Sequence, residues 1–187
     1  IESGLDDVLK FMKKDHDLAQ AYQAIDRLHE AGLIYDAHIM TGVAGKGRGM
    51  ENAEALAQFL NRTNPAHVVN FSMFLHKEVP LYQDIRQGTF VPADELETIR
   101  EEYHLIERIA PEKAGANILY DGFHDFIHVR VRGHLPGDKE KMLAKLNGII
   151  QEYEGKEPVY SFVQGECPDL EYCDDGKAVW DMDRKTS

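Results

Sequence analysis

Three short stretches of the sequence contain residue types that can bind a ligand: "ESG" at Glu2–Gly4, "TGVAGKGRG" at Thr41–Gly49 and "SMFLHKEVPLY" at Ser72–Tyr82. A carboxylate such as Glu2 can accept two hydrogen bonds from a ribose diol, as the acidic residue of dinucleotide-binding folds does. A glycine-rich turn lets the backbone approach a flat ligand closely, because glycine has no Cβ atom. A simpler interpretation stays open, in which Glu2 forms a surface salt bridge and the glycines only allow a tight turn.

The glycine loop does not match the known phosphate-binding patterns. In the Walker pattern four residues separate the first glycine from Gly-Lys-Ser/Thr, whereas Lys46 lies only four residues past Gly42 and is followed by Gly47. Gly45, Gly47 and Gly49 do not form Gly-x-Gly-x-x-Gly either. The sequence therefore predicts no P-loop.

Histidines and cysteines raise the separate question of a metal site. His124 and His128 lie four residues apart in an expected strand, with His134 beyond them, so a metal hydrolase built on these three residues is one hypothesis. No acidic residue completes a convincing ligand set, and half-buried or solvated strand histidines are the alternative that we prefer. The two cysteines, Cys167 and Cys173, match no common zinc signature and are interpreted as ordinary cytosolic thiols.

Periodic apolar residues predict helices alternating with strands. Apolar residues at spacings of three and four between Asp17 and Glu30 indicate an amphipathic helix, which Asp15 or Asp17 caps and Gly32 ends. A later helix begins after the capping residue Asp94, and its expected apolar stripe is Leu96, Ile99, Tyr103 and Ile106. The other expected elements are strands at 33–40 and 66–75, helices at 50–61 and 138–153, and one or two strands at 117–131 with a break at Asp121-Gly122.

This alternation indicates an α/β protein with βαβ units and a mostly parallel sheet. We count about four strands, including a stub at Ile1, whereas a closed parallel barrel has eight. We therefore expect a partial, half TIM-type barrel over residues 1–150, or a small open sheet, followed by an irregular acidic tail over 151–187. Ligands of such folds bind beyond the carboxyl ends of the strands, so the three stretches would line one rim.

The composition narrows the classes of partner. Of 187 residues 43% are hydrophobic and 29% charged, which is typical of a globular protein, and no apolar run is long enough to span a bilayer. The net charge is -12, and residues 152–187 contain ten acidic and four basic side chains. Duplex DNA is disfavoured as a partner, because binding phosphates requires a basic surface. We expect a cytoplasmic protein with no nucleic-acid or membrane partner.

Taken in order, the three stretches resemble the second half of a radical S-adenosylmethionine (SAM) enzyme barrel. Members of that superfamily commonly show "ESG" after the fourth strand, "GxxG" after the fifth, and "PGTPLY" followed by "G-x-F-x-P" after the sixth. The corresponding stretches here are "IESGLDDVLKFMKK", "HIMTGVAG" and "HKEVPLYQDIRQGTFVPADELETIRE". "RGHLPGDKEKMLAKL" is similar to the C-terminal piece of coproporphyrinogen-oxidase-like members, so the resemblance covers about residues 1–150.

The resemblance implies a SAM site and a fragment of a longer enzyme. It places Glu2 or Ser3 at the SAM ribose, His38 and Gly42 beside the ligand, and the backbone near Phe74 and Leu75 at the adenine. The family's Cys-x3-Cys-x2-Cys loop, which holds a [4Fe–4S] cluster, does not occur in this sequence. The expectation is a C-terminal half-barrel that is inactive alone, while an N-terminal half supplies the cluster. The sequence does not identify the substrate.

Two further expectations complete the sequence interpretation. Exposed strand edges of a half-barrel favour pairing with another copy, so we expect a homo-oligomer. The alternative function, from a different class, is a non-catalytic α/β module that binds a nucleotide or a partner protein at the strand-exit loops.

Overall fold

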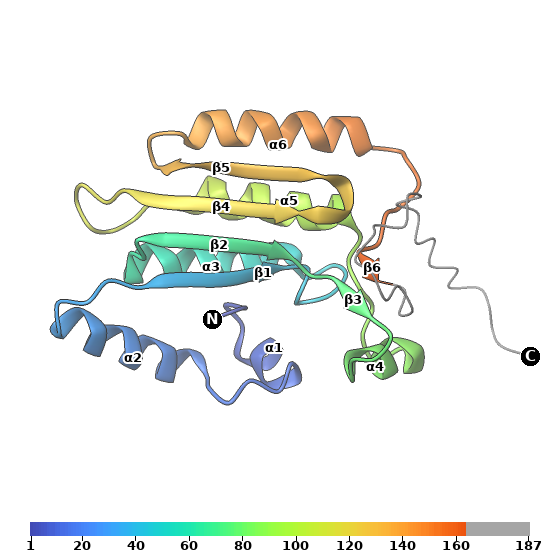
Figure 1. Ribbon diagram of the computed structural model, residues 1–187, viewed down its shortest axis with the longest axis horizontal. Helices are drawn as coiled ribbons and strands as arrows, with labels where there is room; N and C mark the ends of the chain where they lie inside the picture. Colours follow the sequence, from blue (N-terminus) through green and yellow to red (C-terminus); the bar gives the residue numbers. More distant parts are fainter. Residues whose placement is uncertain (164–187) are drawn as a thin grey trace, which may run out of the picture.

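The computed structural model describes residues 1–163 (Figure 1). Six α-helices, one short 3-10 helix and six strands occur in this range. In chain order these are α1 (Asp6–Phe11), α2 (Leu18–Glu30), β1 (Asp36–Thr41), α3 (Gly49–Thr63), β2 (His67–Ser72), β3 (Leu75–His76), α4 (Leu81–Gln87), α5 (Glu95–Arg108), β4 (Ile118–His124), η1 (Asp125–Ile127), β5 (Val129–Leu135), α6 (Lys139–Tyr153) and β6 (Phe162–Val163).

A four-stranded sheet in the order β1-β2-β4-β5 organises the fold. β1 pairs with β2 and β2 with β4 in parallel, and helices α3 and α5 form the crossovers between them. β5 returns antiparallel to β4 through the short turn that contains η1 (Figure 1). The expected α/β class is confirmed: the sheet is mostly parallel, helices alternate with its strands, and the arrangement is a partial TIM-type fold.

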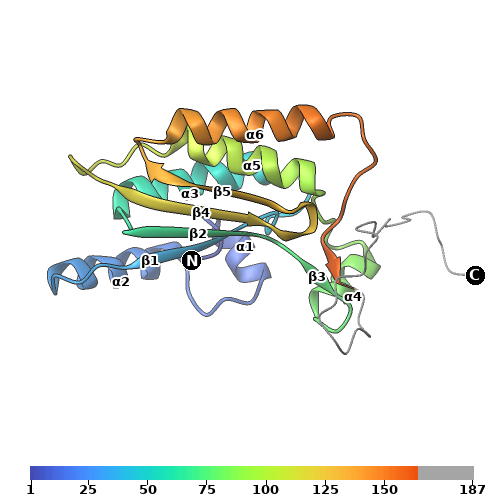
Figure 2. The same cartoon turned by 45° about the horizontal axis from the view of Figure 1, so that its top comes forward.

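Helices α3, α5 and α6 lie on one face of this sheet (Figure 2). Burial alternates along the strands as it does when only one face is covered. In β1, Ala37, Ile39 and Thr41 are buried against the helices, whereas His38 on the opposite face is exposed. In β2 the exposed residue of that opposite face is Phe71. In a closed barrel this open face would be the interior.

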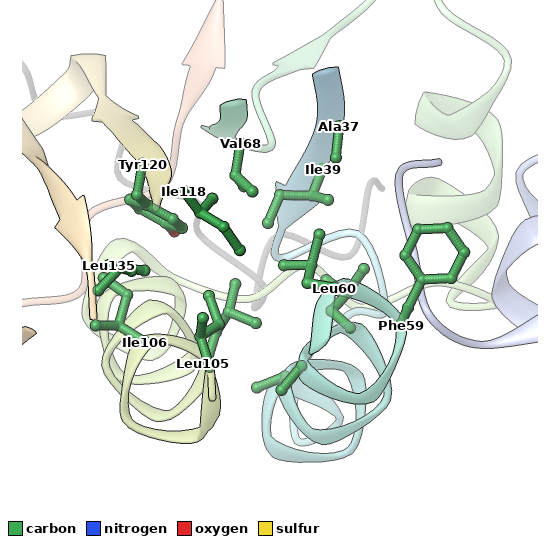
Figure 3. Close-up of a cluster of buried hydrophobic side chains, with 14 of the residues drawn as sticks. Ala37, Ile39, Phe59, Leu60, Val68, Leu105, Ile106, Ile118, Tyr120 and Leu135 are labelled. Atoms are coloured by element: carbon green, nitrogen blue, oxygen red, sulfur yellow. The ribbon is translucent and has the colours of Figure 1, made fainter. Parts of the chain in front are cut away.

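The main hydrophobic core fills the space between the sheet and these helices (Figure 3). Leu60 of α3 and Leu105 of α5 project toward Ile39 and Ile118 of the sheet, and all four side chains are at most 1% exposed. Apolar burial of this extent is the main favourable contribution to folding. The core therefore fixes the positions of α3 and α5, on which the functional site described below depends.

The predicted helix caps are confirmed. Asp17 caps α2 through the backbone N–H of Gln20, whose side chain in turn accepts a hydrogen bond from the Asp17 backbone. Asp94 caps α5 by accepting from the backbone N–H of Glu97 at 2.8 Å. Side-chain oxygens at these positions satisfy donors that the first helical turn cannot pair internally.

Two local expectations were wrong. Ile1 does not begin a strand: one ladder-like hydrogen bond, from the Met40 N–H to the Glu2 carbonyl, joins this segment to β1 before the chain turns into α1. β4 is continuous through Asp121 and Gly122, and the chain breaks instead at 125–128. Glycine is needed at position 122 for space, because a Cβ atom there would lie 1.8 Å from Glu102 Oε1.

A second, smaller core lies beyond the carboxyl ends of the parallel strands. β3 and β6 form a two-stranded parallel sheet there, next to α4 (Figures 1 and 2). Val8 of α1, Val43 of the glycine loop and Leu75 of β3 belong to this cluster.

Among the helices within residues 1–163, none has both the length and the apolar character required to cross a bilayer.

Truncating Leu60 to alanine should lower the free energy of unfolding by about 2–5 kcal/mol, because it leaves a cavity where the side chain is fully buried. Urea unfolding followed by circular dichroism measures this loss. Ile34→Ala is the matched control, since Ile34 is 84% exposed and should change stability by less than about 0.5 kcal/mol. Equal losses in the two variants would contradict the assignment of the core.

Candidate functional site

The structure gathers the three sequence stretches at one end of the sheet. The Met73 N–H, just after β2, donates to the Thr41 carbonyl at the end of β1 at 2.9 Å. The Glu2 carbonyl accepts from Met40 one residue earlier. The second core then packs Val8, which follows the first stretch, with Val43 of the second stretch and Leu75 of the third. These strand ends form the candidate site, which we call the rim.

A buried pair of polar side chains joins two of the three stretches. Asn52 of α3 accepts hydrogen bonds from the Ser3 hydroxyl at 2.7 Å and from the Gly4 N–H at 3.2 Å. Its amide nitrogen donates to Glu101 Oε1 at 2.7 Å. The other oxygen of Glu101 accepts from the Gly42 N–H at 2.8 Å. One carboxylate of α5 thus fixes both the "ESG" segment and the start of the glycine loop.

Gly42 has a conformation and a setting that require glycine. Its φ is +82°, in the left-handed region that residues with a Cβ rarely adopt. A Cβ atom would also lie 2.8 Å from Thr98 Cγ2 of α5. The backbone of the loop therefore passes directly over the first half of α5, with its N–H held by Glu101.

Burial raises the pKa of Glu101 to about 7, and the hydrogen bonds from Asn52 and Gly42 oppose this rise only in part. The side chain is 1% exposed. A carboxylate out of contact with water loses hydration that favours its charged form. The residue that links the two loops therefore titrates near neutral pH.

A second buried cluster ties the ends of β2 and β4 to the same helix. His124, at the end of β4, is fully buried between two carboxylates of α5. Its Nδ1 lies 3.1 Å from Glu95 Oε2 and its Nε2 lies 3.0 Å from Glu102 Oε2. Glu95 also accepts from the Ser72 hydroxyl at the end of β2, at 3.0 Å.

His124 is held as a cation by its two neighbours. Burial alone would lower its pKa, but the negative charges and hydrogen bonds of Glu102 and Glu95 outweigh this and raise the pKa to about 10. Glu102 Oε1 additionally accepts from Asn70 and from the Tyr120 hydroxyl, at 3.1 and 2.9 Å. Both ring nitrogens of the protonated histidine can donate, so the charge is compensated on both sides.

The histidine-based metal site is wrong for this part of the chain. His124 is enclosed on the helix side of β4, whereas His134 lies exposed on β5 and His128 lies in the turn with a φ of +53°. Within residues 1–163 no three histidine, cysteine or acidic residues are grouped so that they could hold a metal ion. Cys167 and Cys173 lie outside the described residues.

The predicted ribose-side residues lie close together in the chain but differ in accessibility. The Glu2 carboxylate forms an ion pair with Lys14 at 2.7 Å, and its side chain is 35% exposed. Ser3 is fully buried, and its hydroxyl is used by Asn52. A ligand could therefore reach the Glu2 side chain, whereas the structure gives the Ser3 side chain an internal role.

The predicted adenine-side residues also divide into an exposed and a buried one. Phe74 is 58% exposed, while Leu75 is 4% exposed and packs in the second core. The Leu75 N–H donates to the Ser161 carbonyl at 2.6 Å. Only the phenyl ring of Phe74 is thus free to stack on a flat group at this position.

His38 belongs to a row of rings across the open face of the sheet. Its ring centroid lies 6.5 Å from that of Phe71, which stacks on Phe123 at 5.5 Å. Arg130 lies over Phe123 at 4.8 Å and donates two hydrogen bonds to Asp121. The guanidinium of Arg130 lowers the pKa of Asp121. The row offers flat apolar surface with a charged pair at one end.

Sequence reasoning missed the buried polar residues of α5. Two members of the expected apolar stripe, Leu96 and Tyr103, are only partly buried. The face that is buried contains Glu95 and Glu102, which are spaced with Ile99 and Ile106 in the helical period of four and three residues. Acidic residues at those positions were the available signal, because a charge in a buried stripe needs a partner elsewhere in the fold.

Comparisons with known proteins give a fold likeness. No protein-family model matches the sequence, and neither does any curated protein. Among solved structures, the fold is similar to an N-terminally truncated Elp3 from the archaeon Methanocaldococcus infernus, with a TM-score of 0.57 and 17% sequence identity. The match covers 85% of this chain and 36% of the Elp3 chain. Elp3 is a member of the radical SAM superfamily.

Replacing His124 with glutamine should lower the free energy of unfolding by about 3–5 kcal/mol, because two buried carboxylates lose their cation. In the wild type this stabilisation is complete below the unfolded pKa of 6.5 and is lost as the pH rises toward 10. Urea unfolding between pH 6 and about 10 measures both effects. The exposed His134→Gln variant is the control and should behave as the wild type.

Glu101→Gln should remove part of the pH dependence of the free energy of unfolding that the wild type shows. The folded carboxyl has a pKa of about 7 and the unfolded one of 4.5, so the folded state holds its proton longer. This group therefore makes the protein less stable as the pH rises from 4.5 to 7, by about 3 kcal/mol at most. Urea midpoints across this range should fall less in Glu101→Gln than in the wild type or in the exposed control Glu140→Gln. Parallel curves for all three would contradict the perturbed pKa.

Proposed function

We propose that this chain forms half of a radical SAM-type barrel and that its rim takes part in binding S-adenosylmethionine. The observation that carries the proposal is the rim itself: Glu101, Glu95 and Glu102 of α5 hold the ends of three neighbouring segments in one fixed arrangement. The fold likeness to Elp3 supports the same assignment. Ligands of parallel α/β folds bind at this end of the sheet.

The described residues fit parts of a SAM molecule. The Glu2 carboxylate is accessible and could exchange its ion pair with Lys14 for the ribose hydroxyls. The glycine loop after Gly42 allows close approach of its backbone, and Phe74 offers an exposed ring for the adenine. His38 faces the open side of the sheet, next to the same rim. When bound, SAM would supply a sulfonium group that could be cleaved only with one electron from a cluster held by other residues.

The iron–sulfur cluster of this superfamily does not fit the residues of this chain. Three cysteine thiolates are required, and the sequence contains two, Cys167 and Cys173. We therefore assign this chain no reaction step that passes through a cluster. Its proposed role is to hold and orient SAM, with the cluster held by other residues.

The open face and the β1 border are the surfaces where the remainder of a barrel would pack. Phe71 is 37% exposed on the open face, and Leu33 and Ile34, just before β1, are 54% and 84% exposed. Unpaired strands with apolar neighbours favour association. We propose that the isolated chain self-associates through these surfaces.

Calorimetric titration of the purified chain with SAM should detect binding at one site without turnover. Gly42→Ala should weaken this binding at least tenfold (about 1.4 kcal/mol), because the new Cβ displaces the glycine loop from α5. Adenosine and methionine, titrated separately, identify which half of the molecule is recognised.

Gly32→Ala is the matched control for that experiment. Gly32 also has a positive φ, of +71°, but it lies at the end of α2, and a Cβ atom there meets nothing within 4 Å. The strain is thus similar while the rim is untouched. Equal affinity for SAM in the two alanine variants, or no heat of binding with the wild type, would refute the proposed role.

A further inference from the structure

Within residues 1–163, β5 is the last strand of the sheet, and one side of its backbone pairs with no other strand. His134 turns its N–H outward, where it donates to Asp138 Oδ2 at 2.8 Å, and the Arg130 carbonyl accepts from Lys145 on the same side. Backbone directions alternate along a strand, so Arg132 presents its N–H and C=O to this outer side too. No hydrogen bond to these two groups is formed within residues 1–163.

A hollow of about 420 Å³ lies along this border, between β5 and α6. Two apolar and four basic residues line it. The lining residues are Arg130, Val131, Arg132, Lys141, Met142 and Lys145, and we call this site the basic groove. Figure 1 shows α6 running beside β5 along this border.

The positive charge of the basic groove is only partly neutralised. Asp121 pairs with Arg130 at 2.6 Å and with Arg132 at 3.6 Å. No ion pair joins Lys141 or Lys145 to an acidic side chain within residues 1–163. Counting Asp121 and also Asp138, which lies on this border next to His134, four cations and two carboxylates leave an excess of two positive charges.

The chain itself contains a segment of complementary charge. Residues 166–175, "ECPDLEYCDD", include five acidic side chains and no basic one. They follow shortly after β6, which lies at the end of the sheet where β5 begins (Figures 1 and 2). The twelve residues 164–175 can extend over about 40 Å. β5 has seven residues and spans about 23 Å, so the segment is long enough to follow it.

We propose that residues 166–175 bind in the basic groove of the same molecule, with their carboxylates between Lys141 and Lys145 and their backbone paired to Arg132. An extended peptide would use both features of the groove, the open N–H and C=O groups of Arg132 and the positive charge. The covalent connection gives the segment a millimolar effective concentration, which favours it over acidic peptides from other proteins. This proposal does not depend on the proposed SAM site.

A second copy of the chain fits the basic groove less well. Two β5 strands paired across a twofold axis would place Arg130 and Arg132 of one copy opposite the same residues of the other. Like charges directly opposite each other destabilise a strand pair. Basic residues on an edge strand are a known protection against such pairing.

Paramagnetic relaxation enhancement in the full chain tests the proposal. Cys167 and Cys173 are its two cysteines, so Cys167→Ser leaves one site, Cys173, for a nitroxide label. The amide NMR signals of Arg132, Met142 and Lys145 should lose most of their intensity at low salt. They should recover at about 1 M NaCl, where the Debye length falls to about 3 Å.

Two test variants, one control variant and one mixing experiment make the result decisive. Lys141→Gln with Lys145→Gln should abolish the effect, as should neutralising the five acidic residues of 166–175 by amide substitutions. Lys10→Gln with Lys113→Gln, a pair of exposed lysines outside the groove, should leave it unchanged. Loss of signal that persists in the groove variant, or that spreads evenly over the protein, overturns the proposal. In the mixing experiment, isotope-labelled chains without a nitroxide are combined with spin-labelled chains without isotopes. Broadening of the NMR signals in that mixture would show binding between copies and would also overturn the proposal.

Discussion

The burial of three carboxylates on α5 is the constraint on which the rest of this structure depends. Glu95, Glu101 and Glu102 are each at most 1% exposed. Leaving a buried charge without partners costs several kcal/mol, roughly 3–5 when one member of a pair is removed. The surrounding fold provides those partners: a cationic histidine, two asparagines, two hydroxyl groups and a loop N–H.

Because these partners come from different strands, satisfying α5 also fixes the rim. Gly42, Ser72 and His124 stand at the ends of three strands of one sheet, and each is bonded to a glutamate of the same helix. The hydrophobic core fixes the position of α5, and the glutamates of α5 in turn fix the loops where a ligand would bind. At the border opposite β1, the antiparallel β5 ends the parallel part of the sheet, so further parallel strands can be added only beside β1.

The sequence was sufficient for the long helices and most strands of the main sheet, and insufficient for the short elements α1, α4, β3 and β6 and for the polar contacts. Helix α2 and its cap were predicted because Asp17 and the apolar period are local signals. The β4–β5 hairpin was placed wrongly because Asp121-Gly122 looks like a turn, whereas Gly122 serves a contact with Glu102 from a distant helix. Asn52 carries no local signal at all, since its role depends on Ser3, Gly4 and Glu101 meeting around it. Residues that act through long-range contacts are those that periodicity cannot reveal.

The β4–β5 hairpin also bears on the order in which the sheet assembles. Four residues connect β4 to β5, whereas 25 separate β1 from β2 and 45 separate β2 from β4. Closing a loop of 45 residues costs about 2 kcal/mol more chain entropy than closing one of four. The hairpin and α6 are therefore the sequence-local part of the fold and can form early, before the crossover pairings. The C-terminal third of the domain would then provide the surface to which the parallel strands, whose pairing is slower, are added.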